Sequence, residues 1–129
     1  MKSPLAVSIL FGALTLATLF ATPAPARTLT SCDEAQSTSA LMTCAEAESR
    51  RQDERLNETV RELMQKSDAE RQNLLKAAQR AWAAFRDAEC KLAADEIRGD
   101  TEAPILAAGC LAQMTQERAD QLGRQLETE

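Results

Sequence analysis

Four cysteines constrain the fold of this 129-residue chain more than any other feature: Cys32, Cys44, Cys90 and Cys110. No two of them form a C-x-x-C pair and the chain contains no histidine, so a thiol redox motif and a Cys/His zinc site are both disfavoured. In an exported chain, four scattered cysteines indicate two disulfides. We therefore predict a small domain closed by two covalent links, with no metal and no cofactor.

The first 26 residues have the pattern of a secretory signal peptide. Lys2 gives a positive start, residues 5–21 are apolar, and Ala24-Pro25-Ala26 forms a small-x-small cleavage site. Cleavage there starts the mature chain at Arg27. We expect that chain to be periplasmic or secreted and to have no membrane span.

Two alternatives to simple cleavage stay open. The apolar stretch could remain as an anchor, although it is slightly short for a membrane span and runs into Pro23 and Pro25. Residues 29–32 (Leu-Thr-Ser-Cys) have the shape of a bacterial lipobox, which would place an acyl chain on Cys32. Lipidation would leave three cysteines, an odd number for an oxidising compartment.

The mature chain is small, acidic and without histidine. It has 103 residues with 14 basic and 20 acidic side chains, a net charge of −6. Without imidazole it has no Ser-His or Cys-His nucleophile pair, and we predict that it is not an enzyme. The negative charge excludes a nucleic-acid site and favours a cationic protein as partner. Its oligomeric state is not predicted by the sequence.

The spacing of apolar residues predicts helices and no strand. Helical periodicity covers about residues 39–66, 68–98 and 110–126, with a loop over 99–109. Residues 37–39 offer N-caps for the first helix, and Ser67 with Glu70 matches a capping box for the second. We predict one all-α domain over 27–129, a small antiparallel bundle of about three helices.

The level of each cysteine in such a bundle favours one disulfide pairing. If the first two helices form an antiparallel hairpin that turns near residue 67, Cys44 lies level with Cys90. The preferred pairs are then Cys44–Cys90 and Cys32–Cys110, at the end opposite the turn. Sequence alone allows three connectivities, so the other two stay open.

Three groups of side chains are candidates for a site or for the core. We assign the two aromatic residues of the mature chain, Trp82 and Phe85, to the core, on an apolar stripe of the second helix that also includes Leu74 and Leu92. A polar group is interpreted as structural contacts that fix helix register, with Asn57 facing Gln79. Its members are Asp53, Asn57, Gln79 and Arg118.

An acidic group near the predicted loop is the candidate contact for a cationic protein. It consists of Asp95, Glu96, Asp100 and Glu102. A disulfide-closed end can hold such a loop rigidly, which suits recognition. A loop that is only solubilising is the competing interpretation.

Several motifs together resemble the LprI-type lysozyme inhibitor domain, a family of small exported bacterial domains. They cover nearly the whole mature chain: Cys32-x3-Gln36, Cys44, Asp53-x2-Leu56-Asn57, the run from Ala78-Gln79-Arg80-Ala81-Trp82 through Phe85-Arg86-Asp87 to Cys90, and Cys110-Leu111-x3-Thr115-x2-Arg118. Family members often have Gly-Gly in the loop before the last cysteine, whereas this chain has Gly99-Asp100.

The resemblance implies a small helical domain closed by disulfides that binds and blocks a lysozyme-like muramidase. Two other functions stay open. One is a periplasmic immunity or envelope-stress protein with a different target, and the other is a structural envelope protein with no inhibitory site.

Overall fold

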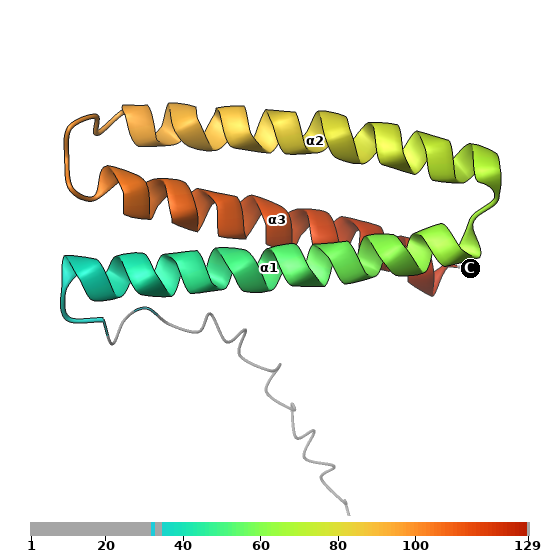
Figure 1. The fold of residues 1–129 in the computed structure, drawn as a ribbon, viewed down its shortest axis with the longest axis horizontal. Helices are drawn as coiled ribbons and strands as arrows, with labels where there is room; N and C mark the ends of the chain where they lie inside the picture. Colours follow the sequence, from blue (N-terminus) through green and yellow to red (C-terminus); the bar gives the residue numbers. More distant parts are fainter. Residues whose placement is uncertain (1–31, 33–34, 129) are drawn as a thin grey trace, which may run out of the picture.

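The computed structural model describes Cys32 and residues 35–128, which form a three-helix protein (Figure 1). The helices are α1 (Thr38–Lys66), α2 (Ala69–Asp95) and α3 (Ala103–Glu127). The all-α prediction is confirmed. The predicted signal peptide, and the lipobox apart from Cys32, lie outside the described residues. Within these, no helix has the length and apolar character needed to cross a membrane.

The turn between α1 and α2 lies where the sequence places it, but a different residue caps the second helix. Ser37, inside the predicted group, caps α1. For α2 the capping side chain is Asp68, which accepts a hydrogen bond from the Arg71 N–H at 2.8 Å. The Ser67 hydroxyl instead donates to the Leu63 carbonyl at 2.7 Å. The Ser67 capping box is therefore wrong, because Ser67 closes α1 rather than opening α2.

The third helix begins seven residues earlier than predicted. A turn of seven residues, 96–102, replaces the expected loop over 99–109. Pro104 lies in the first turn of α3, where a missing N–H costs no helical hydrogen bond. Gly99 has φ +90° and reverses the chain between α2 and α3. Both residue types are typical of loops, but here Pro104 marks the start of α3 and Gly99 marks the turn before it.

Helix α3 lies between the other two helices and supplies most of the core (Figure 1). It packs closely along α1 and less extensively against α2, whereas α1 and α2 scarcely touch. The central buried cluster joins α1 to α3 through Leu56, Leu63, Ala119 and Leu122. Alanines of α3 let the two backbones approach closely. Helix α2 contributes one buried residue, Cys90.

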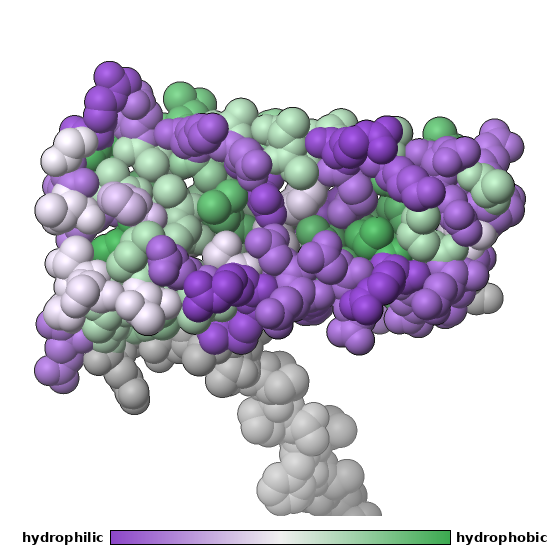
Figure 2. Space-filling view, in the orientation of Figure 1, coloured by the Kyte–Doolittle hydropathy of each residue, from purple (hydrophilic) through white to green (hydrophobic). Residues whose placement is uncertain are grey.

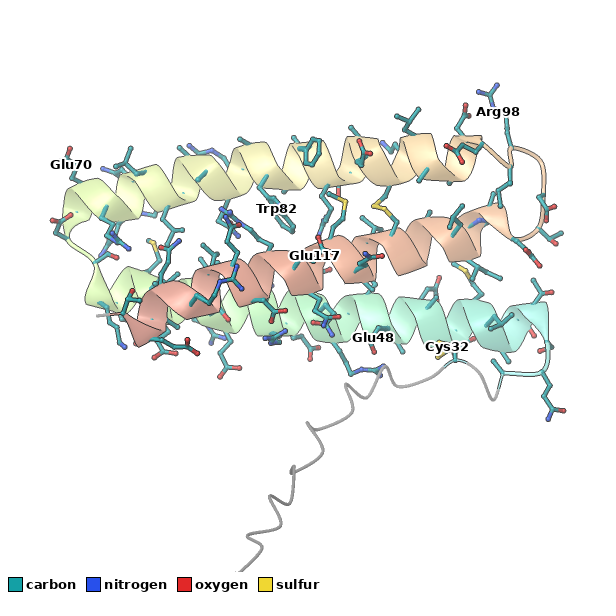
Figure 3. The ribbon with its side chains drawn as sticks, turned by 180° about the vertical axis from the view of Figure 1, so that it is seen from behind. Cys32, Glu48, Glu70, Trp82, Arg98 and Glu117 are labelled. Carbon is teal, nitrogen blue, oxygen red and sulfur yellow. A yellow bond between two sulfur atoms is a disulfide. The ribbon has the colours of Figure 1, made fainter. Side chains whose placement is uncertain are left out.

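Two disulfides are present, as predicted, but the preferred pairing is wrong. Cys32 is bonded to Cys44 and Cys90 to Cys110, with Cα–Cα distances of 5.8 and 5.5 Å. The prediction of Cys44–Cys90 required α1 and α2 to pack directly. Because α3 intervenes, the neighbour of Cys90 is on α3, and Cys44 joins the segment that precedes α1 (Figure 3).

The assignment of Phe85 to the core is also wrong. Its exposed fraction is 57%, whereas Trp82 is half-buried and packs against the central cluster. The helix directs Trp82 and Cys90 toward α3, which leaves Phe85 at the exposed edge of this side. Leu74 and Leu92, expected on the same buried stripe, are 65% and 64% exposed.

Candidate functional site

A mostly buried arginine joins the three helices at the middle of the molecule. The Arg86 side chain, on α2, is 16% exposed. Its Nη1 donates to Asp53 Oδ1 of α1 at 2.9 Å and to Thr115 Oγ1 of α3 at 3.0 Å. Thr115 is fully buried, so this bond supplies a donor to a hydroxyl that water does not reach. Arg86 thus fixes the position of α2 relative to α1 and α3.

Two guanidinium groups flank the tryptophan ring. The Cζ of Arg86 lies 5.1 Å from the Trp82 ring centroid, and that of Arg118 lies 5.9 Å from it. Both distances fall in the range of cation–π attraction. Figure 3 shows Trp82 pointing from α2 toward α3. The ring therefore serves as a packing surface for charged groups as well as for the core.

The four predicted polar residues fall into three places. Arg118 Nε donates to Gln79 Oε1 at 2.7 Å, which links α3 to α2. Asp53 is the α1 partner of Arg86. Asn57 is exposed on α1, and the partner of Gln79 is Arg118 rather than Asn57. The predicted facing of Asn57 and Gln79 is wrong for the same reason as the disulfide, since α1 and α2 are separated.

Arg86 and Thr115 are the residues that sequence reasoning missed. A signal was available, because Gln79, Trp82, Arg86 and Cys90 recur at intervals of three and four residues and so share one side of a helix. That side faces α3. A charged residue on it indicates a partner on another helix, which Thr115 and Asp53 provide.

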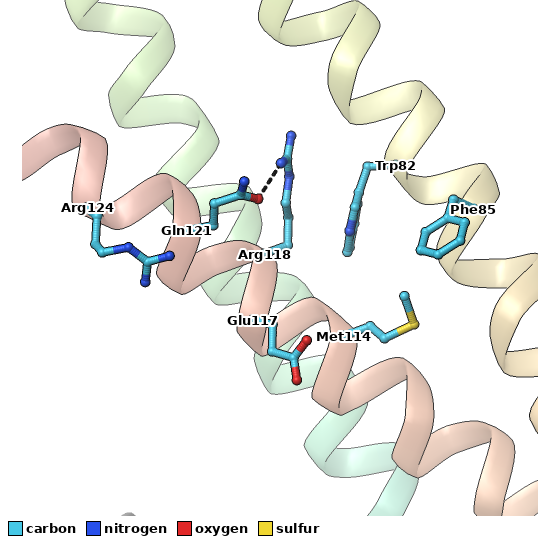
Figure 4. Close-up of a pocket in the computed structure, with 7 residues that line it drawn as sticks. All are labelled: Trp82, Phe85, Met114, Glu117, Arg118, Gln121 and Arg124. Atoms are coloured by element: carbon cyan, nitrogen blue, oxygen red, sulfur yellow. Dashed lines mark hydrogen bonds between the residues drawn. The ribbon is translucent and has the colours of Figure 1, made fainter.

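A shallow hollow of about 370 Å³ lies between α2 and α3 beside Trp82 (Figure 4). Phe85 and Met114 form its apolar wall, and Arg118, Glu117 and Arg124 its polar one. Burial lowers the pKa of the Arg118 guanidinium, yet an arginine remains charged at neutral pH. Arg118 also donates to Gln121 at 2.6 Å, so its position is fixed from both helices.

The four predicted acidic residues gather at the α2–α3 turn, and all four are exposed: Asp95, Glu96, Asp100 and Glu102. Asp95 pairs with Arg98 at 2.6 Å, and Asp100 Oδ1 accepts the Glu102 N–H at 2.9 Å. Arg98 projects from this end (Figure 3). Four carboxylates against one guanidinium leave the turn with a net charge of −3.

One disulfide joins the two helices on either side of the turn. Cys90 on α2 and Cys110 on α3 join the two helices that enter and leave it. Backbone bonds close the turn itself, from Asp100 N–H to the Ile97 carbonyl at 3.0 Å and from Ala103 N–H to the Asp100 carbonyl at 3.3 Å. The acidic side chains are therefore presented from a fixed backbone.

One carboxylate of α1, that of Glu48, lies apart from this turn and has a shifted pKa. The pKa of Glu48 lies below its ordinary value, because the ionised carboxylate accepts a hydrogen bond from Gln52 at 2.6 Å and lies beside Arg51. These are contacts along a single helix. Among the described residues, no group of His, Cys, Asp and Glu side chains has an arrangement that would hold a metal ion.

Comparisons with known proteins identify the family of this chain. The family model of lysozyme inhibitor LprI matches residues 31–122. The chain is 37% identical over 110 residues to uncharacterized protein R02472 of Rhizobium meliloti (strain 1021), in an alignment that covers 75% of this chain and 79% of that protein. No solved structure matches.

Proposed function

Because this chain belongs to the lysozyme inhibitor LprI family, we propose that it is an exported, non-enzymatic protein that binds a cationic lysozyme-like muramidase and blocks its cleft. The protein acts as one domain over residues 27–129, after removal of residues 1–26. Two disulfides support export to the periplasm or beyond, because such bonds persist in oxidising compartments.

The observation that carries this proposal is the exposed acidic turn between α2 and α3. Its net charge of −3 attracts a cationic enzyme and raises the rate of encounter. The Cys90–Cys110 bond joins the two helices that carry the turn and restricts its motion, which lowers the conformational entropy lost on binding. A rigid, narrow end of a helical protein can enter a cleft that a flat surface cannot.

A titration of muramidase activity tests the inhibition. The exported chain, purified with both disulfides intact, is added to a cationic lysozyme at 50 and 300 mM salt. We expect inhibition that saturates at a one-to-one ratio and weakens with salt, because screening shortens the range of attraction. Full muramidase activity at a large excess of the chain would contradict the proposal.

A pair of matched variants tests the role of the turn. The first removes its four carboxylates: Asp95→Asn, Glu96→Gln, Asp100→Asn and Glu102→Gln. The second removes four exposed carboxylates of α1: Glu46→Gln, Glu54→Gln, Glu58→Gln and Glu62→Gln. Both change the net charge by the same amount.

We expect the turn variant to bind the enzyme at least tenfold more weakly and the α1 variant to change affinity less than threefold. Equal losses would mean that net charge acts without a defined contact. Unchanged affinity in the turn variant would move the contact elsewhere. Capture of a different toxin or factor with no muramidase inhibition would favour an immunity or envelope-stress role.

A further inference from the structure

The hollow beside Trp82 has an apolar half and a cationic half, and the proposed inhibition uses neither. Trp82, Phe85 and Met114 line the apolar half. Arg118 and Arg124 line the cationic half. In Figure 4 the Trp82 ring lies between Arg118 and Phe85, so the two halves adjoin. The volume of about 370 Å³ is in the range of small-molecule sites.

The hollow exists because long polar side chains, rather than a filled apolar core, hold α2 to α3. Cys90 is the one buried residue of α2. The bonds from Arg118 to Gln79 and from Arg86 to Thr115 span the space between the two helices. Figure 2 shows, on one face, apolar residues in the band between α2 and the helices below it, bordered by hydrophilic residues. A small ligand can therefore lie between α2 and α3 without displacing the central cluster.

Arg118 differs from Arg86, the other arginine at the tryptophan ring, in having no acidic partner. Arg86 forms ion pairs with Asp53 and Asp87. Arg118 donates to two neutral glutamine amides and, within the part of the chain that the structure describes, forms no ion pair. Burial lowers the pKa of its guanidinium, which reflects the cost of holding this charge partly away from water. An anion at this position would offset that cost.

The other charges of the hollow favour an anion as well. Arg124 is exposed and has neither a hydrogen bond nor an ion pair with any described residue through its side chain. Glu117 accepts a hydrogen bond from Gln113 at 3.1 Å, and Figure 4 shows its carboxylate pointing away from the Arg118 guanidinium. Two basic side chains against one acidic side chain leave the hollow with a net charge of +1.

We propose that this hollow binds a small organic carboxylate whose remaining part is apolar. The Arg118 guanidinium has five N–H donors and uses two of them on described residues, so others can hold the carboxylate through paired hydrogen bonds. The apolar part of the ligand lies against Trp82, Phe85 and Met114, whose rings and sulfur offer a contact surface. The site is separate from the acidic turn and stands without the proposed inhibition.

Phenylacetate and phenylacetamide form a matched pair of probes, because they share a ring and differ in charge at neutral pH. Each is titrated to about 20 mM, at constant ionic strength, into the exported chain with its disulfides intact. Binding is followed by the NMR signals of the Met114 methyl group and of the Trp82 indole N–H, the only indole of the chain. Because the hollow is shallow, we expect a Kd of about 1–10 mM for phenylacetate and at least tenfold weaker binding of the amide.

Three variants locate the site. Arg118→Gln should weaken phenylacetate binding at least tenfold. Because this change also removes the bond to Gln79, a second variant is Arg124→Gln, which removes a charge from the hollow and no bond to a described residue. It should weaken binding about threefold. The matched control is Arg80→Gln, an exposed arginine of α2 that does not line the hollow, and it should leave the Kd unchanged.

Equal binding of phenylacetate and phenylacetamide overturns the proposal, because charge would then play no part. Equal effects of Arg124→Gln and Arg80→Gln also overturn it, since they would indicate a long-range attraction without a defined site. A Trp82 signal that does not move at about 20 mM phenylacetate has the same meaning.

Two further controls test the place and the chemistry of the ligand. If sodium acetate moves the Trp82 and Met114 signals as far as phenylacetate does, the hollow takes a bare anion and the proposed ligand class is wrong. A neighbouring hollow shares Arg118 and is lined by Leu74 and Leu75. Movement of the signals of these two leucines without that of Met114 would place the ligand there and overturn the proposed site.

Discussion

Replacement of Arg86 by methionine isolates the contribution of the buried arginine that joins the helices. Methionine retains an unbranched apolar stem of similar reach and removes the guanidinium. Besides an exposed ion pair with the adjacent Asp87, three contacts are lost: the bond to Thr115, the ion pair with Asp53, and the cation–π contact with Trp82. The central cluster between α1 and α3 does not include residue 86, so it stays intact.

The three losses have different sizes. Thr115 is fully buried, and a buried polar group that loses its partner costs about 1–3 kcal/mol. Asp53 is 47% exposed, so water screens its ion pair and the loss is under about 1 kcal/mol. The Trp82 contact adds about 0.5–1 kcal/mol. We therefore expect Arg86→Met to lower the free energy of unfolding by about 2–4 kcal/mol.

Urea unfolding with oxidised disulfides measures this change by circular dichroism at 222 nm and by Trp82 fluorescence. The matched control is Arg80→Met, an exposed arginine on the same helix, with an expected change within about 0.5 kcal/mol. Arg86→Met combined with Thr115→Val should recover part of the loss, because both partners are then apolar. A loss below about 1 kcal/mol for Arg86→Met, or one equal to the control, refutes the reasoning.

The structure carries three more predictions. Removal of the Cys90–Cys110 bond by alanine at both positions should cost about 3 kcal/mol, measured by thermal unfolding against the parent chain, since the bond closes a loop of 20 residues. Phe85→Ala should cost less than about 1 kcal/mol in urea, because the ring is mostly exposed, and a loss above 3 would return it to the core. Gln52→Ala should raise the pKa of Glu48 in a carboxyl NMR titration. Because the folded-state pKa of Glu48 is lowered, its stabilisation is present above the unfolded-state pKa and is lost as pH falls through the folded-state value, and the variant should lose less stability on acidification.

The sequence alone predicts the helical class, the two disulfides and the turn near residue 67, because each depends on local pattern. Ser37 and Asp68 cap the starts of α1 and α2, and Ser67 caps the end of α1, each by hydrogen bonds to neighbouring backbone groups. The start of α3 was missed because Pro104 has two local meanings. It can stand in a loop or in the first helical turn, and only the burial of Ala108 in the folded protein decides.

The disulfide pairing could not be predicted from levels along the helices. Counting residues from a turn gives the position of each cysteine along the helix axis, but it does not say which helix lies beside it. Here α3 separates α1 from α2. Adjacency is set by the central cluster, where Leu63 of α1 packs with Leu122 of α3. Because α3 lies between α1 and α2, Cys90 of α2 is bonded to Cys110 of α3. The acidic turn follows from the sequence because it requires only the order of residues.

Helix α2 shows why its buried side was misassigned. Counting apolar residues favours the side with Leu74, Phe85 and Leu92 as the inner side, yet the other three apolar residues on that side are alanines, whose burial contributes little. The side of α2 that faces α3 instead carries Cys90, which forms a disulfide, and Trp82, which packs on the central cluster. It also carries Arg86 and Gln79, whose hydrogen-bond partners lie on α1 and α3. These contacts together exceed what two leucines and one phenylalanine gain. Leu74, Phe85 and Leu92 are therefore left largely exposed.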